Sequence, residues 1–290
     1  MGVIVSVHHR YATIDGHRLF YREAGDPAAP AVVLLHGFPA SSFMFRGLIP
    51  ALADRYHVIA PDHLGFGHSD APAATDFGYS FDALAGLTAG LLRVLGVPRY
   101  AIYVQDYGAP IGWRLALRPE EPVTAIVTQN GNGYEAGLVE DFWKPVRAFW
   151  EHPGPDTEAG VRSALDLEAI RWQYTHGVPD PSLVSPDTWT LDHALVSRPG
   201  NDAIQVRLFA DYATNLALYP RLHGYLREKR PPVLAVWGRN DEIFGPAGAE
   251  AFRADVPDAE IHLLDGGHFL LESHPAEATA LIRDFLARTH

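Results

Sequence analysis

The sequence predicts an α/β fold with a mostly parallel, doubly wound sheet and an inserted helical lobe. Apolar runs of strand length alternate with helix-like segments over residues 1–130, a spacing typical of right-handed crossovers between parallel strands. The alternation stops over residues 131–230, where prolines punctuate helix-like pieces and four of the six tryptophans occur. Strand-like runs resume over residues 231–290, so we predict two core segments with one lobe inserted between them.

Turn signals and capping residues place the elements of the two core segments. Asp15-Gly16 indicates a tight hairpin between the first two strands, and Ser80 and either Ser41 or Ser42 can cap a helix start. The predicted strands are Ile4 to Tyr11, Arg18 to Glu23, Ala31 to Leu35, Val58 to Ala60, Tyr100 to Val104, Val123 to Thr128, Val233 to Trp237 and Ile261 to Leu264. The predicted helices cover residues 42–53, 81–96, 110–118, 247–254 and 275–287.

The bulk composition excludes several classes of function. The net charge of −12 leaves no basic stripe that could meet the phosphates of nucleic acid or of an anionic membrane. No apolar run reaches the roughly 18 residues of a membrane span, and no signal peptide is evident. The absence of cysteine excludes thiolate metal sites and fits a reducing compartment. We therefore expect a cytoplasmic protein that binds neither nucleic acid nor membrane.

The stretch from Tyr100 to Arg118 is the feature around which the chain is organised. A buried strand is followed after only five residues, 105–109, by a helix-like segment with Pro110 in its first turn. Such a strand–turn–helix elbow pushes one side chain into the open above the sheet, and here that residue is Asp106. The small residues Gly108 and Ala109 allow the helix to begin close to the strand. The alternative is that Asp106 only caps the helix.

An aspartate at this elbow changes the chemistry expected of the site. A carboxylate is ionised at pH 7 but is a poor nucleophile toward esters and amides, because it is a better leaving group than theirs. It can displace a leaving group from an sp3 carbon and form an ester with the enzyme. The sequence therefore favours opening of an epoxide or expulsion of a halide over ester hydrolysis.

Hydrolysis of such an ester needs a base, and fifteen histidines are available. His268 lies in the glycine-rich loop after the last predicted strand, at the same edge of the sheet as Asp106, so we predict that it is the base. Asp241 follows the preceding strand and is predicted to orient His268, with Glu242 as the alternative. Asn130 also ends a strand at this edge, but it carries no charge.

Two backbone N–H groups are predicted to form the oxyanion hole. The N–H of Tyr107 points into the elbow, and the N–H of Phe38 follows the turn His36-Gly37. Gly67-His68-Ser69-Asp70-Ala71 resembles a serine elbow, but no strand leads into it and no helix follows it. We therefore interpret Ser69 as structural and His36 as a brace for its own loop.

Together these pieces resemble the aspartate-nucleophile branch of the α/β-hydrolase superfamily, which holds epoxide hydrolases and haloalkane dehalogenases. The resemblance covers nearly the whole chain, and it implies an α/β-hydrolase fold in which residues 131–230 are the cap domain. It also implies that neither a cofactor nor a metal is needed. The matching motifs are His36-Gly37-Phe38-Pro39, Gly65-Phe66-Gly67-His68-Ser69, Val104-Gln105-Asp106-Tyr107-Gly108 and Gly267-His268-Phe269.

The resemblance bears on how the leaving group is stabilised. Haloalkane dehalogenases carry a tryptophan after the nucleophile, and fluoroacetate dehalogenases an arginine, whereas this chain has Tyr107. Epoxide hydrolases use two cap tyrosines, of which Tyr212 matches one. The second is absent from residues 143–150, and Tyr134 or Tyr174 is the possible substitute. The aromatic residues expected to line an apolar substrate pocket are Trp143, Phe149, Trp150 and Tyr174.

These observations lead to three hypotheses. The first is an epoxide hydrolase-like enzyme acting on a small apolar substrate and water, with Asp106, His268 and Asp241 as its catalytic residues. The second keeps this mechanism but expels halide, held by Trp143 or Trp150 and the Tyr107 hydroxyl. The third is a non-catalytic ligand receptor, which should lack at least one catalytic residue. The oligomeric state has no signature in the sequence.

Overall fold

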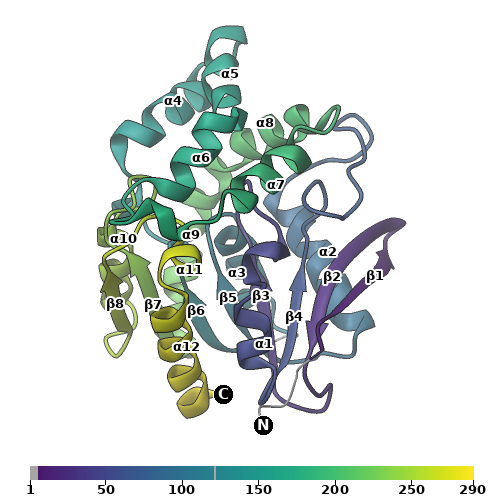
Figure 1. Cartoon of the computed structure of the whole chain (residues 1–290), viewed down its shortest axis with the longest axis vertical. Helices are drawn as coiled ribbons and strands as arrows, with labels where there is room; N and C mark the ends of the chain where they lie inside the picture. Colours follow the sequence, from purple (N-terminus) through teal and green to yellow (C-terminus); the bar gives the residue numbers. More distant parts are fainter. Residues whose placement is uncertain (1–5, 121) are drawn as a thin grey trace.

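Eight strands form one sheet in the order β1-β2-β4-β3-β5-β6-β7-β8 in the computed structural model, which describes residues 6–120 and 122–290 (Figure 1). The pairs β1–β2 and β2–β4 are antiparallel, and the other neighbours are parallel. The strands are β1 (His8–Ile14), β2 (His17–Ala24), β3 (Ala31–Leu35), β4 (His57–Pro61), β5 (Tyr100–Val104), β6 (Val123–Thr128), β7 (Val233–Gly238) and β8 (Glu260–Leu264). The predicted α/β-hydrolase fold, with its mostly parallel sheet, is confirmed.

Strands buried on both faces were the most accurately predicted. The strands β3, β5 and β6 begin and end where the sequence placed them, because turn formers bound each uninterrupted apolar run. At the hairpin, Asp15 and Gly16 both have positive φ (48° and 84°), as a tight turn between twisted strands requires. The first strand was predicted from Ile4, but residues 4 and 5 lie outside the described residues, and β1 runs three residues further than predicted.

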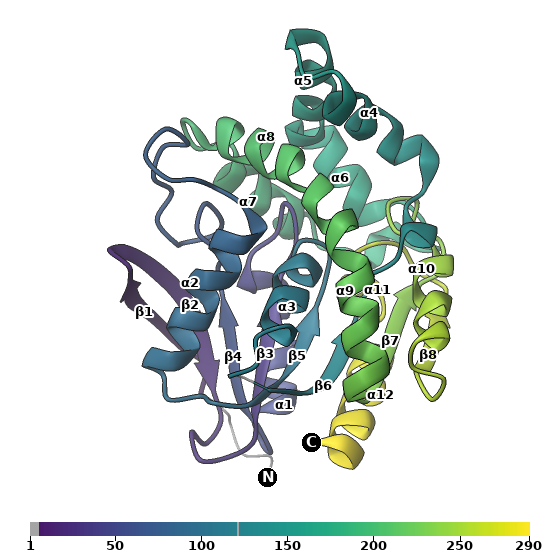
Figure 2. The ribbon, with the colours of Figure 1, turned by 180° about the vertical axis from the view of Figure 1, so that it is seen from behind.

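Helices cover both faces of the sheet. One face carries α1 (Leu48–Leu52) and α12 (Pro275–Thr289), as Figure 1 shows, and the other carries α2 (Phe81–Val94), α3 (Gly108–Ala116) and α9 (Ala213–Lys229), as Figure 2 shows. The remaining α-helices are α4 (Glu140–Glu151), α5 (Pro155–Arg162), α6 (Leu167–Thr175), α7 (Pro186–Val196), α8 (Asn201–Asp211), α10 (Pro246–Ala251) and α11 (Leu270–Ser273), and short 3₁₀ helices lie at Glu135–Gly137, Ser163–Leu165 and Pro181–Leu183. Within the described part of the chain, no helix is long and apolar enough to cross a membrane.

Two predicted helices are interrupted in the structure. The single helix predicted over residues 42–53 is wrong, because a 3₁₀ helix (Ser42–Phe45) and α1 occupy this range separately. Pro50 has no N–H to donate to the preceding turn, and its ring obstructs a continuous helix there. The segment predicted over residues 247–254 is α10 followed by a 3₁₀ helix (Phe252–Ala254). Ser41 and Ser80 accept the capping N–H bonds of their helices.

Between β6 and β7 the described chain consists of helices and the loops that join them, and its one strand-like feature is the isolated bridge from Leu138 to Phe244, which lies after β7. Helices α4 to α8 lie beyond the carboxyl ends of the parallel strands, and α9 then runs back along the sheet beside α3 (Figure 2). The division into core segments 1–130 and 231–290 and a cap at 131–230 stays a prediction. Whatever the exact bounds of the cap, helices α4 to α8 lie over the sheet edge at which the predicted site residues meet.

The buried guanidinium of Arg114 connects the elbow helix α3 to its neighbours. It donates to Asn215 Oδ1 (2.7 Å) and Thr214 Oγ1 (3.0 Å) at the start of α9 and pairs with Asp82 on α2. Because α9 begins directly after Tyr212, this contact fixes the position of Tyr212 relative to the elbow.

Candidate active site

Asp106 lies at the sharp turn between β5 and α3. Its backbone has φ of 46°, a left-handed conformation that non-glycine residues rarely adopt. The turn is possible because the neighbouring positions lack side chains. A Cβ on Gly108 would lie 2.1 Å from the carbonyl oxygen of Leu35, and a Cβ on Gly37 would lie 2.2 Å from the Cβ of Asp106. The predicted elbow is therefore present, with Asp106 at its tip.

The two carboxylate oxygens of Asp106 have different surroundings. Oδ1 accepts the backbone N–H bonds of Phe38 (2.6 Å) and Tyr107 (2.5 Å), the two groups predicted for an oxyanion hole. Oδ2 lies 3.9 Å from Nε2 of His268. Burial raises the pKa of Asp106 to about 6, although His268 and the two N–H bonds counteract this rise. One oxygen is thus held by the backbone while the other faces the predicted base.

His268 is held on its other side by Asp241. Its Nδ1–H donates to Oδ2 of Asp241 (2.8 Å), which fixes the tautomer with the proton on Nδ1. Burial lowers the pKa of His268, but the carboxylates of Asp241 and Asp106 outweigh burial, so that this pKa lies above its ordinary value. The structure therefore brings Asp106, His268 and Asp241 together as predicted. Glu242, the alternative acid, instead pairs with His176 (3.1 Å).

Two polar residues after β6 support this arrangement, and the sequence reading missed their roles. Asn130 donates to Oδ2 of Asp241 (2.7 Å), and its own Oδ1 accepts the N–H of Gly238 (2.9 Å). Gln129 donates to the carbonyl oxygen of His268 (2.8 Å). Their position at the carboxyl end of a buried parallel strand was the available signal. From the sequence we considered Asn130 only because an acidic residue could have occupied its position.

Tyr212 is completely buried, and its ring lies among those of Trp143 (4.6 Å between centroids), Phe81 (5.6 Å) and Tyr107 (5.9 Å). The hydroxyls of Tyr212 and Tyr107 have no hydrogen-bond partner. Tyr219 lies beside Tyr212, but the two hydroxyls do not meet hydrogen-bond geometry. Burial raises the pKa of both Tyr212 and Tyr107 well above the usual value, and the charge of Asp106 contributes to both rises. Two protonated, unpartnered hydroxyls therefore lie within electrostatic range of Asp106.

The other aromatic residues predicted at the site have different surroundings. The indole N–H of Trp143 donates to the carbonyl oxygen of Ile243 (2.9 Å), and that of Trp150 to the carbonyl oxygen of Phe209 (2.7 Å). Neither N–H is free to bind a halide in this arrangement, which disfavours the predicted halide contacts of Trp143 and Trp150. Both rings still lie against Tyr212, since Trp150 stacks on it at 6.3 Å.

The other residues that we predicted at the site are Phe149, Tyr174 and Tyr134, and none of them supplies a free hydroxyl there. Phe149 lines a separate cavity between α4, α5 and α8. The ring of Tyr174 stacks on Phe269 (3.8 Å), next to His268, but its hydroxyl donates to Asp192. The hydroxyl of Tyr134 donates to Asp255 (2.8 Å). Tyr134 and Tyr174 therefore offer no free hydroxyl as the second tyrosine donor that the resemblance implies.

Ser69 and His36, which we interpreted from the sequence as structural residues, each hold a loop in place through hydrogen bonds. Ser69 accepts the N–H of Phe20 (2.9 Å) and donates to the carbonyl oxygen of Asp62 (2.7 Å). His36 accepts the N–H of His63 (3.1 Å), which joins its loop to the loop after β4.

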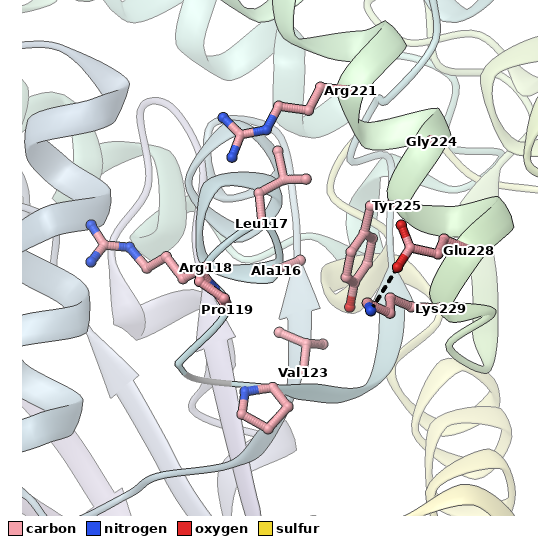
Figure 3. Close-up of a pocket in the computed structure, with 11 residues that line it drawn as sticks. Ala116, Leu117, Arg118, Pro119, Val123, Arg221, Gly224, Tyr225, Glu228 and Lys229 are labelled. Carbon is pink, nitrogen blue, oxygen red and sulfur yellow. Dashed lines mark hydrogen bonds and ion pairs between the residues drawn. The ribbon is translucent and has the colours of Figure 1, made fainter.

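An open pocket of about 660 Å³ lies far from Asp106, between the end of α3, the start of β6 and the second half of α9 (Figure 3). Val123 lines it at the amino end of β6, whereas Asp106 follows the carboxyl end of the neighbouring strand. None of the predicted site residues contributes to it. The candidate site is therefore defined by its side-chain geometry and not by this open pocket.

Comparison with known proteins finds one matching family and several similar proteins. The family described as alpha/beta hydrolase fold matches residues 30–275. The uncharacterized hydrolase YNR064C of Saccharomyces cerevisiae is 45% identical, over 94% of this chain and 95% of that protein. Epoxide hydrolase A of Mycobacterium tuberculosis is 41% identical, over 96% of each chain. The solved structure of haloalkane dehalogenase DbeA from Bradyrhizobium elkani USDA94 has a TM-score of 0.79 at 25% identity, over 98% of both chains.

The raised pKa of Asp106 predicts that this residue destabilises the folded protein near neutral pH. Its folded pKa of about 6 exceeds the ordinary value of 3.8, so the folded state binds more protons and stability falls as pH rises between these values. Asp106→Asn keeps the Oδ1 acceptor and removes the charge. We expect it to raise the free energy of unfolding by roughly 1–3 kcal/mol at pH 7, with the gain vanishing near pH 4.

Denaturant titration between pH 4 and pH 8 measures this difference. Asp258→Asn, which removes an exposed carboxylate, is the matched control and should not reproduce the gain of Asp106→Asn. A destabilised Asp106→Asn at pH 7, or a gain that does not depend on pH, would contradict the assigned burial of the charge.

Proposed function

The chain belongs to the α/β-hydrolase family, on the branch of epoxide hydrolases and haloalkane dehalogenases that its motifs resemble, and on this premise we propose that it hydrolyses a small apolar epoxide through an ester on Asp106. The observation that carries the proposal is the asymmetry of this carboxylate. Oδ1 is held by two backbone N–H groups, and Oδ2 faces His268 across 3.9 Å. An attacking oxygen and a stabilised oxygen are the two parts that alkyl transfer followed by ester hydrolysis requires.

In the first step Asp106 Oδ2 attacks a ring carbon of the epoxide. The bond from Oδ2 to carbon forms while the bond from carbon to the ring oxygen breaks. The ring oxygen takes a proton from a buried tyrosine hydroxyl, for which the unpartnered hydroxyls of Tyr212 and Tyr107 are the available donors. The step leaves a hydroxyalkyl ester on Asp106 and one tyrosinate.

In the second step water attacks Cγ of Asp106. Nε2 of His268 takes a proton from this water, and Asp241 stabilises the imidazolium through the 2.8 Å bond to Nδ1. The negative charge that develops on Oδ1 is stabilised by the N–H groups of Phe38 and Tyr107. Collapse releases the diol oxygen, which is protonated by His268, and the proton of the new Asp106 carboxyl group neutralises the tyrosinate.

The surroundings of Asp106 favour an epoxide over an alkyl halide. An opening epoxide needs a donor that gives up its proton, whereas a departing halide needs only hydrogen bonds from free N–H or O–H groups. Two tyrosine hydroxyls are free, while the indole N–H groups of Trp143 and Trp150 are bonded to carbonyl oxygens. The relative at 41% identity is named epoxide hydrolase A, which agrees with this choice. Buried aromatic rings around Tyr212 fit a small apolar substrate.

Dehalogenation is the second candidate, supported by the structural likeness to haloalkane dehalogenase DbeA and by the Tyr107 hydroxyl. A non-catalytic receptor is disfavoured, because Asp106, His268 and Asp241 lie together, with 3.9 Å between Asp106 and His268 and 2.8 Å between His268 and Asp241. We also propose that residues 131–230 act as a cap, that the protein needs no cofactor or metal, and that it works in the cytoplasm.

Trapping the ester on Asp106 tests the proposed function. In His268→Gln the base is lost while the nucleophile remains, so incubation with a panel of epoxides should add the mass of one whole epoxide. The double variant Asp106→Asn/His268→Gln is the matched control and should gain nothing. Intact-protein mass spectrometry measures both.

The same variant incubated with alkyl halides separates the two candidate functions. An adduct of the alkyl group without halogen, in the absence of epoxide adducts, would replace epoxide opening with dehalogenation. A folded variant that gains mass with neither panel would overturn alkyl transfer and favour the receptor hypothesis.

Removing the Tyr212 hydroxyl tests its proposed role as a proton donor. In the His268→Gln background, Tyr212→Phe should slow ester formation from an epoxide by roughly 10- to 100-fold, a loss smaller than that of a lone general acid because Tyr107 remains. Tyr225→Phe, on the far pocket of Figure 3, is the control. Equal rates of adduct growth in the two variants would remove Tyr212 from the mechanism.

A further inference from the structure

Gln105, the residue before the proposed nucleophile, contacts the proposed base directly. Its side-chain nitrogen Nε2 lies 2.8 Å from Nε2 of His268, and both side chains are buried. The position of Gln105 is fixed by the end of β5, since its backbone N–H donates to the carbonyl oxygen of Leu35 (3.1 Å). The contact is therefore part of the elbow itself.

The proton positions in this contact follow from Asp241. Its carboxylate can only accept, so Nδ1 of His268 carries a proton, and Nε2 of the neutral ring has a free lone pair. The amide N–H of Gln105 donates to that lone pair. The base that would accept a proton from water is thus already hydrogen-bonded while Asp106 is unmodified.

The other atom of the amide has no partner. Oε1 of Gln105 is buried without a hydrogen bond, close to Gly37, where an added Cβ would lie 2.5 Å from it. Turning the amide by 180° about its last bond therefore breaks no hydrogen bond of Oε1. The turned amide presents an acceptor to His268, and this acceptor suits a ring that carries a proton on Nε2.

We propose that Gln105 is a positioning residue for ester hydrolysis, which donates to neutral His268 and, after turning, accepts from its imidazolium. This inference rests on the proposed function. In the hydrolytic step the O–H bond of water breaks, the Nε2–H bond of His268 forms, and the water oxygen bonds to Cγ of Asp106. The new Nε2–H then donates to Oε1 of Gln105 until the proton passes to the departing diol oxygen.

The proposal assigns Gln105 to one half of the reaction. Ester formation uses Oδ2 of Asp106 and does not require His268 to change its protonation, so Gln105 should matter little there. Ester hydrolysis requires His268 to accept a proton and hold it. The charged groups that face His268 are Asp106 and Asp241, and the Glu242–His176 pair lines a small void beside it.

Two nearly isosteric variants separate this role from simple packing. Gln105→Met keeps the volume and removes both hydrogen-bonding atoms, so ester hydrolysis should slow by roughly tenfold or more, while ester formation stays within about twofold. Gln105→Glu supplies only acceptors and favours the imidazolium, so the pH of half-maximal hydrolysis should rise by roughly one unit or more. Gln205→Met is the matched control, because Gln205 is also buried with an unpartnered Oε1.

Single-turnover experiments with an epoxide that forms the Asp106 ester measure the two steps separately as a function of pH. Equal losses in both steps for Gln105→Met would show a purely structural role and overturn the proposal. An unshifted pH profile for Gln105→Glu would overturn it as well. A wild-type-like Gln105→Met, in a protein whose His268→Gln variant still accumulates the ester, would remove Gln105 and leave the proposed function standing.

Discussion

The buried carboxylate of Asp106 is the constraint on which the rest of the site depends. An ionised group buried in the protein is unfavourable unless donors meet it, and burial accordingly raises the pKa of Asp106 to about 6. Two backbone N–H groups and the nearby His268 offset part of this cost. Both N–H groups can reach Oδ1 because the backbone of Asp106 is left-handed. Gly37 and Gly108 allow this turn, since a side chain at either position would collide with it. In the proposed mechanism this incomplete stabilisation of the resting carboxylate favours formation of a neutral ester.

The sheet brings these groups together from distant parts of the sequence. Neighbouring parallel strands β3, β5, β6 and β7 end at the same edge, and each is followed by a residue of the site: Phe38, Asp106, Asn130 and Asp241. Tyr212 joins the site from the junction between α8 and α9, and α9 is tied to the elbow helix by Arg114. The proposed base and its partners thus rest on rigid strand ends, which hold positions more accurately than long loops do.

The sequence could predict the features that depend on backbone pattern. Buried parallel strands are uninterrupted apolar runs, so β3, β5 and β6 were placed without error, and the residues after their ends could be named. Side-chain hydrogen bonds have no such pattern. The bonds of Gln105 to His268, of Asn130 to Asp241 and of the Trp143 indole to Ile243 depend on rotamers that spacing does not encode. The break before α1 was missed because Pro50 was not weighed against the apolar run around it.

The path of the water oxygen tests the central claim most directly. A single turnover is run in ¹⁸O-labelled water with the protein in excess over an epoxide, and both the diol and the peptide that contains Asp106 are weighed. If Asp106 forms the ester, the diol receives its second oxygen from the carboxylate, so the diol stays unlabelled while Asp106 gains ¹⁸O. A diol labelled in the first turnover, with Asp106 unlabelled, would show direct attack of water on the substrate and contradict the ester mechanism.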